Sequence, residues 1–147
     1  MKKIKVVKEN ENATLPTKGT EDSAGMDLYA NVTEPITIMP HETVKVSSGI
    51  RMEIPKGYAG FIYARSGLST KKGIALINKV GVIDSDYRGV IGLPLHNYGT
   101  KPQIIEPNER VAQMIIQKYL PVELIDVEEL SETERGDGGF GSTGTHE

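Results

Sequence analysis

The chain has 147 residues, of which 37% are hydrophobic and 25% charged, a balance typical of one compact domain rather than a disordered or membrane-spanning chain. Seventeen basic residues against twenty acidic ones leave a net charge of −3, which argues against a protein held on nucleic acid by bulk charge. The sequence contains no cysteine, which excludes disulfides, thiolate nucleophiles and cysteine-ligated zinc.

The first residues are basic, and their apolar run ends at Val7, which is too short for the core of a signal peptide. No run reaches the about 20 apolar residues of a membrane span. We therefore expect a cytoplasmic protein that has neither a membrane nor a nucleic acid as its partner. The three histidines lie far apart and do not form an HExxH zinc motif.

Most of the chain consists of short apolar runs bounded by turn-forming residues, a pattern that predicts strands. The runs lie at residues 43–54, 61–64, 74–78, 90–97, 111–117 and 122–127. Turns that recur about every 8–12 residues favour a β-sandwich or barrel over alternating strands and helices. Pro94 lies inside one run, so we expect that strand at a sheet edge or with a bulge.

One segment, Ser66–Lys72, is predicted to be a helix. Ser66 is the expected N-cap, Lys71 and Lys72 suit the C-terminal end, and Gly73 ends the helix.

The chain divides by composition into a β-rich core domain over residues 1–134 and a glycine-rich tail over residues 135–147. Fixing the thirteen backbones of the tail costs on the order of 13 kcal/mol or more, at about 1–2 kcal/mol each. Burying Phe140, its one large apolar residue, returns only about 1.5–3 kcal/mol. The tail is therefore either a flexible end or a segment that a binding partner orders.

Five segments gather small or charged residues where strand formers are expected, and two of them precede residue 70. In 24–30 (AGMDLYA), Asp27 is either a turn carboxylate bonded to nearby amides or an acid of a binding site. In 64–69 (ARSGLS), the amides of Ser66 and Gly67 beside Arg65 are suited to phosphate oxygens. An ordinary capped helix with a surface arginine fits that segment equally well.

Residues 77–89 (INKVGVIDSDYRG) form the most informative segment. Gly81 stands between short apolar residues, which suggests a tight hairpin whose backbone closely faces a ligand. Asp84, Asp86 and Tyr87 then follow within a few residues. They form either a solvated or cation-binding turn, or a general base, Asp84, beside an aromatic platform, Tyr87.

The last two segments are 107–116 (PNERVAQMII) and the tail. Arg110 and Gln113 interrupt an apolar strand, as polar residues do on any half-exposed strand. The tail combines glycine amides with hydroxyls and Arg135, which is the inventory of a phosphate-binding loop, although it lacks the lysine and the spacing of GxxxxGK[ST]. Phe140 is suited to stacking on a flat ring.

Taken in this order, the segments AGMDLYA, RSGLS, GVIDSDYRG, ERVAQMI and RGDGGFGSTG resemble the five motifs of the homotrimeric deoxyuridine triphosphate nucleotidohydrolases (dUTPases). The resemblance covers residues 24–144. It implies an all-β, jelly-roll-like subunit of the β-clip type with one short helix and a flexible C-terminal tail that closes over an active site. It further implies a homotrimer with active sites at its subunit interfaces, and hydrolysis of dUTP to dUMP and pyrophosphate with Mg²⁺ on the triphosphate.

The resemblance also implies a role for each matching residue. Asp84 would be the catalytic base that deprotonates the water attacking the α-phosphorus. Asp27 would act either on Mg²⁺ through water or on the organisation of the site. Substrate would be bound by Arg65, Ser66, Gly67, Asn78, Gly81, Val82, Ile83, Tyr87, Gln113, Arg135, Phe140, Gly141, Ser142 and Thr143. Within this set, Asn78 and the backbone of 81–83 would bind uracil, Tyr87 would pack beneath the deoxyribose, and Phe140 would stack on the base.

Two other functions compete with this one. The dCTP deaminases resemble the same fold, but usually have RSS in place of RSG and lack this tail with its phenylalanine. A dUTPase-like scaffold without catalysis is the second, and the joint presence of Asp84, Tyr87, Arg135 and Phe140 argues against it, while a regulatory role beside catalysis stays open. The sequence departs from the family at Asn108, where glycine is common, and asparagine tolerates the same left-handed backbone.

Overall fold

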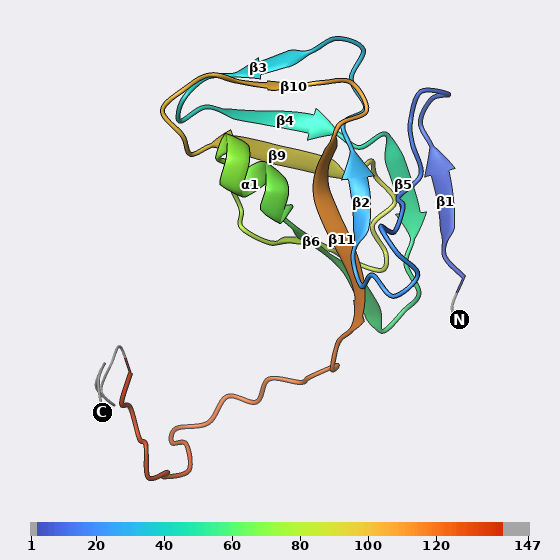
Figure 1. Ribbon diagram of the computed structural model, residues 1–147. Coiled ribbons are helices and arrows are strands. Elements are labelled where there is room, and N and C mark those ends of the chain that lie inside the picture. The colour runs from blue at the N-terminus through green and yellow to red at the C-terminus, as the bar shows by residue number, and fades with distance from the viewer. Residues whose placement is uncertain (1–2, 140–147) are drawn as a thin grey trace.

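The computed structural model describes residues 3–139, which fold into short antiparallel strands and one helix (Figure 1). The strands are β1 (Lys5–Lys8), β2 (Met26–Tyr29), β3 (Ile36–Ile38), β4 (Thr43–Ser47), β5 (Ile50–Glu53), β6 (Tyr58–Tyr63), β7 (Ile74–Leu76), β8 (Gly81–Ile83), β9 (Gly92–Asn97), β10 (Gln103–Ile105) and β11 (Arg110–Lys118). The helix α1 covers Ser66–Lys72. The predicted all-β class with one short helix is confirmed.

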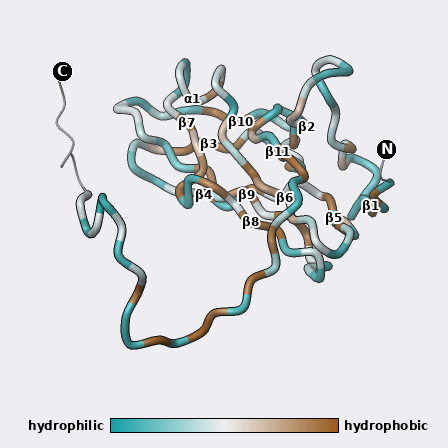
Figure 2. Tube along the Cα trace, turned by 90° about the horizontal axis from the view of Figure 1, so that it is seen from below, coloured by the Kyte–Doolittle hydropathy of each residue, from teal (hydrophilic) through white to brown (hydrophobic). Residues whose placement is uncertain are grey.

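Two larger sheets, of order β2-β11-β6-β8 and β4-β9-β7, enclose the core, and the pairs β1-β5 and β10-β3 complete the strands. Every one of these pairings is antiparallel. Figure 1 shows β3, β10, β4 and β9 side by side at one end of the molecule, with β2 and β11 running in another direction. The aliphatic side chains that both sheets bury include Leu28, Ile62 and Met114 from the first sheet and Val46, Leu76, Leu93 and Leu95 from the second. The apolar runs of these strands lie inside the molecule in Figure 2.

The helix α1 confirms the predicted range, and its C-terminal end follows the predicted chemistry. Gly73 adopts a left-handed conformation (φ 67°), and its amide donates to the Ser69 carbonyl at 3.0 Å. The predicted cap is wrong, because Arg65 occupies the N-cap position and no side chain caps the helix. The amides of the first turn therefore have no partner inside the helix. Within residues 3–139, no helix is long and apolar enough to span a bilayer.

The prediction that Pro94 lies in an edge strand or at a bulge is wrong, since β9 lies between β4 and β7 and pairs with both without a shift in register. In an antiparallel pair, the N–H and C=O groups of one residue point to the same neighbouring strand. The Pro94 carbonyl accepts from the Ile77 amide at 2.9 Å, on the β7 side. Its missing N–H faces Ile77, the residue after the end of β7, so the one bond that proline does not make lies just beyond the paired part of β7.

Other boundaries also differ from the predicted runs. The run 43–54 is divided into β4 and β5 at Gly49, whose φ of 67° breaks the extended backbone. The run 122–127 was predicted as a strand, and the structure has none there. Asn108 has a φ of 60°, so asparagine does keep the left-handed turn before β11.

Asn97 fixes the loop between β9 and β10 from inside the protein. Its side chain is fully buried, and Nδ2 donates to the carbonyls of Ile38 (2.9 Å) and Lys101 (2.8 Å). Its Oδ1 accepts from the Gly99 amide at 2.9 Å. These three bonds tie the loop to β3 and hold its own turn closed.

We expect Asn97→Ala to lower the free energy of unfolding by about 2–4 kcal/mol, because the buried Ile38 carbonyl and two partly buried backbone groups lose their partner. Urea denaturation at a fixed protein concentration measures the change, and the exposed Asn12→Ala is the matched control. A midpoint equal to that of the control would show that water replaces all three bonds.

Candidate active site

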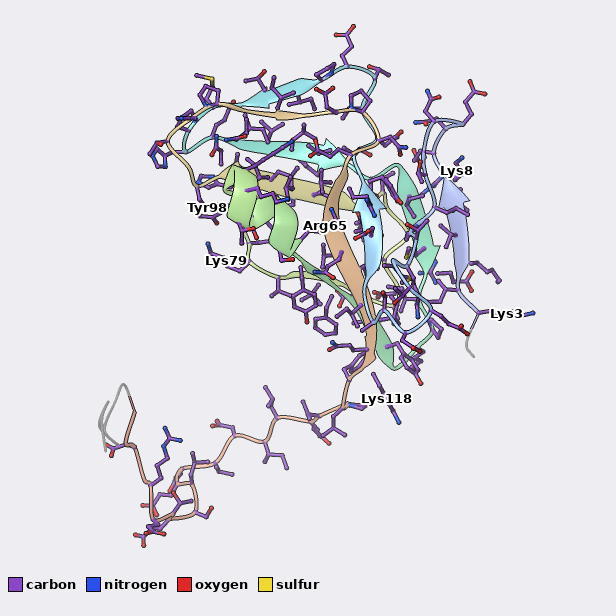
Figure 3. The ribbon with its side chains drawn as sticks, viewed as in Figure 1. Lys3, Lys8, Arg65, Lys79, Tyr98 and Lys118 are labelled. Atoms are coloured by element: carbon purple, nitrogen blue, oxygen red, sulfur yellow. The ribbon has the colours of Figure 1, made fainter. Side chains whose placement is uncertain are left out.

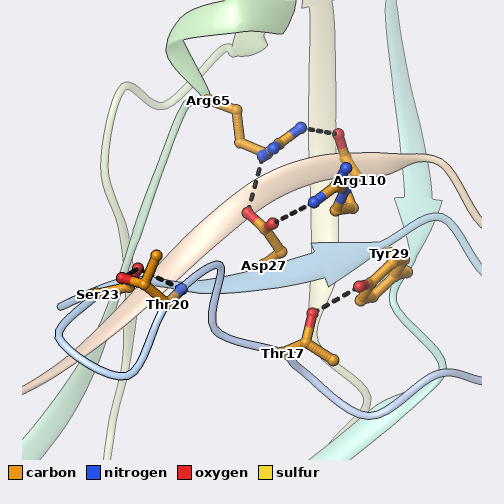
Figure 4. A network of polar contacts seen from close by, with 7 residues as sticks. All are labelled: Thr17, Thr20, Ser23, Asp27, Tyr29, Arg65 and Arg110. Atoms are coloured by element: carbon orange, nitrogen blue, oxygen red, sulfur yellow. Dashed lines mark hydrogen bonds and ion pairs between the residues drawn. The ribbon is translucent and has the colours of Figure 1, made fainter.

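Asp27 lies at the centre of an ion-pair network that joins three elements (Figure 4). It stands on β2, and its Oδ1 accepts from Nε of Arg65, the residue before α1, at 2.8 Å. Arg110, at the start of β11, donates from Nη1 to Asp27 Oδ2 at 3.4 Å. Arg65 Nη1 also donates to the Arg110 carbonyl at 3.1 Å. With its side chain only 15% exposed, Asp27 acts as the counter-ion that positions both guanidinium groups.

These three residues line a cleft of about 450 Å³ whose other walls are mostly small. The remaining lining residues are Gly19, Ser23, Ala24, Gly25, Ser66, Gly67, Gln113 and Ile115. Gln113 is held by a bond from Nε2 to the Ala64 carbonyl at 2.9 Å. The cleft brings together guanidinium groups, a side-chain amide and the first-turn amides of α1, a donor set suited to an anionic ligand.

A second, smaller recess lies at the start of β8. Asn78 and the β8 residues Gly81, Val82 and Ile83 line a space of about 90 Å³ together with Ile62, Leu76, Gly92 and Pro94. Gly81 pairs with Ile62 of β6, and a Cβ atom on Gly81 would come within 3.2 Å of the Ile62 Cβ. The backbone of β8 therefore lies tight against β6. The predicted hairpin is a tight turn, but β7 and β8 belong to different sheets and do not pair.

Asp84 directly follows β8 and begins a loop that is closed by hydrogen bonds to its backbone carbonyls. The Asp84 carbonyl accepts from the Tyr87 amide at 3.2 Å, and Arg88 Nη1 donates to the carbonyls of Ser85 (2.7 Å) and Tyr87 (3.0 Å). The Asp84 side chain is exposed and lines a cavity of about 720 Å³ with Asp86, among others. The carboxylate is therefore available to a substrate, on a loop whose backbone is closed by hydrogen bonds.

Tyr87 presents its ring beside this loop. Its hydroxyl donates to the Val90 carbonyl at 3.0 Å, and 43% of the residue is exposed. A Cβ atom on Gly89 would overlap the ring, so glycine at 89 is what lets the ring lie flat along the chain.

The predicted site residues fall into separate groups within one chain. Asp27, Arg65, Ser66, Gly67 and Gln113 share the cleft, whereas the recess at β8 and the cavity at Asp84 have no lining residue in common with it or with each other. No hydrogen bond or ion pair between side chains within residues 3–139 joins the cleft to the Asp84 loop.

The C-terminal residues of the predicted site stand apart from all three groups. After β11 the chain runs away from the β-structure (Figure 1). Arg135 lies on this segment, where its Nε donates to the Gly138 carbonyl at 2.9 Å. Phe140, Gly141, Ser142 and Thr143 lie outside the described residues.

Two residues of the cleft have roles that the sequence did not predict. Arg110 was noted as an interruption of an apolar strand, but its pairing with Asp27 spans 83 positions and leaves no local signal. Gly25 does carry a signal, since it is two residues from Asp27. A Cβ atom there would lie 2.5 Å from Gln113 Oε1, so glycine leaves room for that side chain.

These elements define an all-β protein of the β-clip class. The chain belongs to the dUTPase family, because the family model for dUTPase matches residues 11–144. The deoxyuridine 5'-triphosphate nucleotidohydrolase of Hydrogenobaculum sp. (strain Y04AAS1) is 49% identical over 142 residues, covering 97% of this chain and 98% of that protein.

Solved structures agree with the family model. The Staphylococcus bacteriophage 80alpha dUTPase with dUpNHpp has a TM-score of 0.85 at 26% identity, covering 99% of this chain and 100% of that one. A mutant dUTPase from phage phi11 of S. aureus, described with a structural Mg(II) ion, has a TM-score of 0.80 at 24% identity, over 89% and 100% of the two chains.

Proposed function

We propose that this protein is a dUTP diphosphatase, which hydrolyses dUTP to dUMP and pyrophosphate in the cytoplasm. The observation that carries the proposal is that the chain has both a cleft lined by Arg65, Arg110 and the start of α1 and a small recess lined by Asn78 and β8. The first suits a polyphosphate and the second suits a flat base. The 49% identity to a protein named for this activity supports the same assignment.

The proposed base site is the recess at β8. The amide side chain of Asn78 and the backbone groups of residues 81–83 supply fixed donors and acceptors for the edge of uracil. Cytosine presents the opposite pattern at its 4-position, which would leave site groups unpaired. The close packing of Gly81 on Ile62 supports the exclusion of the 5-methyl group of thymine. Tyr87 is the proposed surface beneath the deoxyribose, where a ribose 2'-hydroxyl would clash.

The proposed triphosphate site is the cleft around Asp27. Arg65 and Gln113 donate to phosphate oxygens together with the amides of Ser66 and Gly67. The tail, residues 135–147, would close over the bound nucleotide. In that closed state Arg135 would bind the terminal phosphate, Phe140 would stack on uracil, and Gly141, Ser142 and Thr143 would supply further donors.

The proposed chemical step uses Asp84 as the general base. A water oxygen forms a bond to the α-phosphorus while the bond from that phosphorus to the bridging oxygen breaks. Pyrophosphate leaves with the electron pair of the broken bond, and Asp84 takes the proton of the water. The exposure of Asp84 on a closed loop supports this role.

Mg²⁺ would enter the site bound to the triphosphate of the substrate. Across residues 3–139, no group of three or more His, Asp or Glu side chains could hold a metal ion. Mg²⁺ binds phosphate oxygens and keeps several waters, so it would enter on the triphosphate and neutralise its charge. Both carboxylate oxygens of Asp27 face guanidinium groups, and we propose that they also accept from metal-bound water.

We propose a homotrimer whose active sites lie between subunits. In one chain the cleft and the Asp84 loop line different cavities, which supports sites that a second copy completes. The segment after β11 also needs a partner surface. Five of its large apolar side chains are 72–92% exposed, namely those of Leu120, Val122, Leu124, Ile125 and Leu130. Figure 2 shows brown stretches along this extended segment, away from the β-structure.

Pyrophosphate release from dUTP, dTTP, dCTP and UTP in the presence of Mg²⁺ tests the proposed function. We expect rapid release from dUTP and rates at least about 100-fold lower from the other three, because each leaves site groups unpaired or clashes with them. Ammonia release from dCTP would instead identify a deaminase. Nucleotide binding without any release would identify a non-catalytic scaffold.

A further inference from the structure

The turn that carries Asn78 has a strained backbone. Lys79 has a φ of 65°, and the Val80 amide donates to the Asn78 carbonyl at 2.7 Å, which closes a three-residue γ-turn around Lys79. The γ-turn with positive φ is rare and strained. Such strain persists only where the surrounding structure holds it.

The side chain of Lys79, which is exposed, makes the contact that joins this turn to another part of the chain. Its Nζ donates to the hydroxyl of Tyr98 at 2.6 Å and lies 4.1 Å from the centre of the Tyr98 ring. Figure 3 labels Tyr98 beside the helix α1 and Lys79 a little lower on the same side. The contact links residues 19 positions apart, and so ties the turn to the loop between β9 and β10.

Tyr98 is itself held on a rigid support. Its amide donates to the Gly73 carbonyl at 2.9 Å, and it directly follows the buried Asn97. The ring of His96 packs edge-on against the Tyr98 ring, with centroids 4.3 Å apart. His96 Nδ1 in turn lies 2.8 Å from the hydroxyl of Thr43 on β4.

We infer that Lys79 and Tyr98 form a positioning pair, which fixes the strained turn so that Asn78 faces the recess at β8 in a base-binding orientation. The inference rests on the proposed function, because it assigns the pair to substrate binding. Neither residue lines the recess, so the pair acts through Asn78 and affects affinity for the nucleotide.

Steady-state kinetics of Lys79→Met and Tyr98→Phe test the pair. Each variant removes one end of the hydrogen bond and keeps the size of the side chain. We expect KM for dUTP to rise about three- to tenfold in both, with kcat little changed, since the contact holds bound and reacting substrate alike. The double variant should be no worse than either single one, and Lys79→Arg should keep most of the affinity.

Two controls separate positioning from other effects. Lys101→Met removes an exposed positive charge from the same loop region, and we expect it to leave KM unchanged. Tyr98→Phe removes the hydrogen bond but keeps the charge of Lys79. A rise in KM in Lys79→Met without a rise in Tyr98→Phe would therefore overturn the inference. Hydrogen exchange of the Val80 amide should be about threefold faster or more in both test variants than in the control.

Equal exchange rates would overturn the inference even in an active enzyme, and so would single-variant effects that multiply in the double variant. A wild-type protein that releases no pyrophosphate from dUTP contradicts the proposed function. The exchange rates still report on the turn in that case, so the two failures are distinguishable.

Discussion

Asp84→Asn is expected to lower kcat for dUTP by about 10²–10⁴-fold while KM stays within about twofold, the pattern of a lost proton acceptor. Asparagine has the shape of aspartate and still accepts hydrogen bonds, but it does not take a proton from water. The nucleotide should remain bound, because the recess at β8 and the cleft around Asp27 do not depend on this carboxylate.

Asp86→Asn is the matched control for that result. Asp86 lies two residues further along the same loop, is exposed and lines the same cavity, so its substitution makes the same change in charge. We expect it to retain most of the wild-type kcat in the pyrophosphate assay. A normal kcat for Asp84→Asn would remove Asp84 from the role of base, and equal losses in both variants would point to the charge of the loop instead.

The parts of the fold that the sequence predicts are those with local causes. The range of α1 follows from its C-terminal glycine and from the strand formers that flank it, and β11 follows from the long apolar run after Asn108. The motif segments also single out residues that lie together, because Arg65, Ser66 and Gly67 share one cleft with Asp27 and Gln113.

The parts that sequence analysis misses are set by distant contacts. The strands β1, β3 and β10 have three or four residues each and exist because a partner strand pairs with them, which a local pattern does not reveal. The pairing of Asp27 with Arg65 spans 38 positions. The run 122–127 shows the opposite case, since its pattern is that of a strand but no strand within the described part of the chain pairs with it.

A mixture of two impaired variants is expected to recover activity if the sites are shared between subunits. Asp84→Asn removes the base, and Arg65→Gln weakens the phosphate cleft while its amide can still bond to Asp27. In a symmetric ring, each site takes Asp84 from one subunit and Arg65 from the next. Random assembly of equal amounts therefore makes both contributors intact in about a quarter of the sites.

Co-expression of the two variants, followed by the pyrophosphate assay, measures this recovery against each variant alone. Ultracentrifugation of the same sample should give the mass of three chains. The control is a chain that carries both substitutions, co-expressed with wild type. About a quarter of the sites should be active if the sites are shared between subunits, and about half if each site lies within one chain. The contrary outcome is that the co-expressed variants show no more activity than the sum of the two measured separately. That result would mean that Asp84 and Arg65 serve the same site from one subunit. The separate cavities of the chain make this the less favourable geometry.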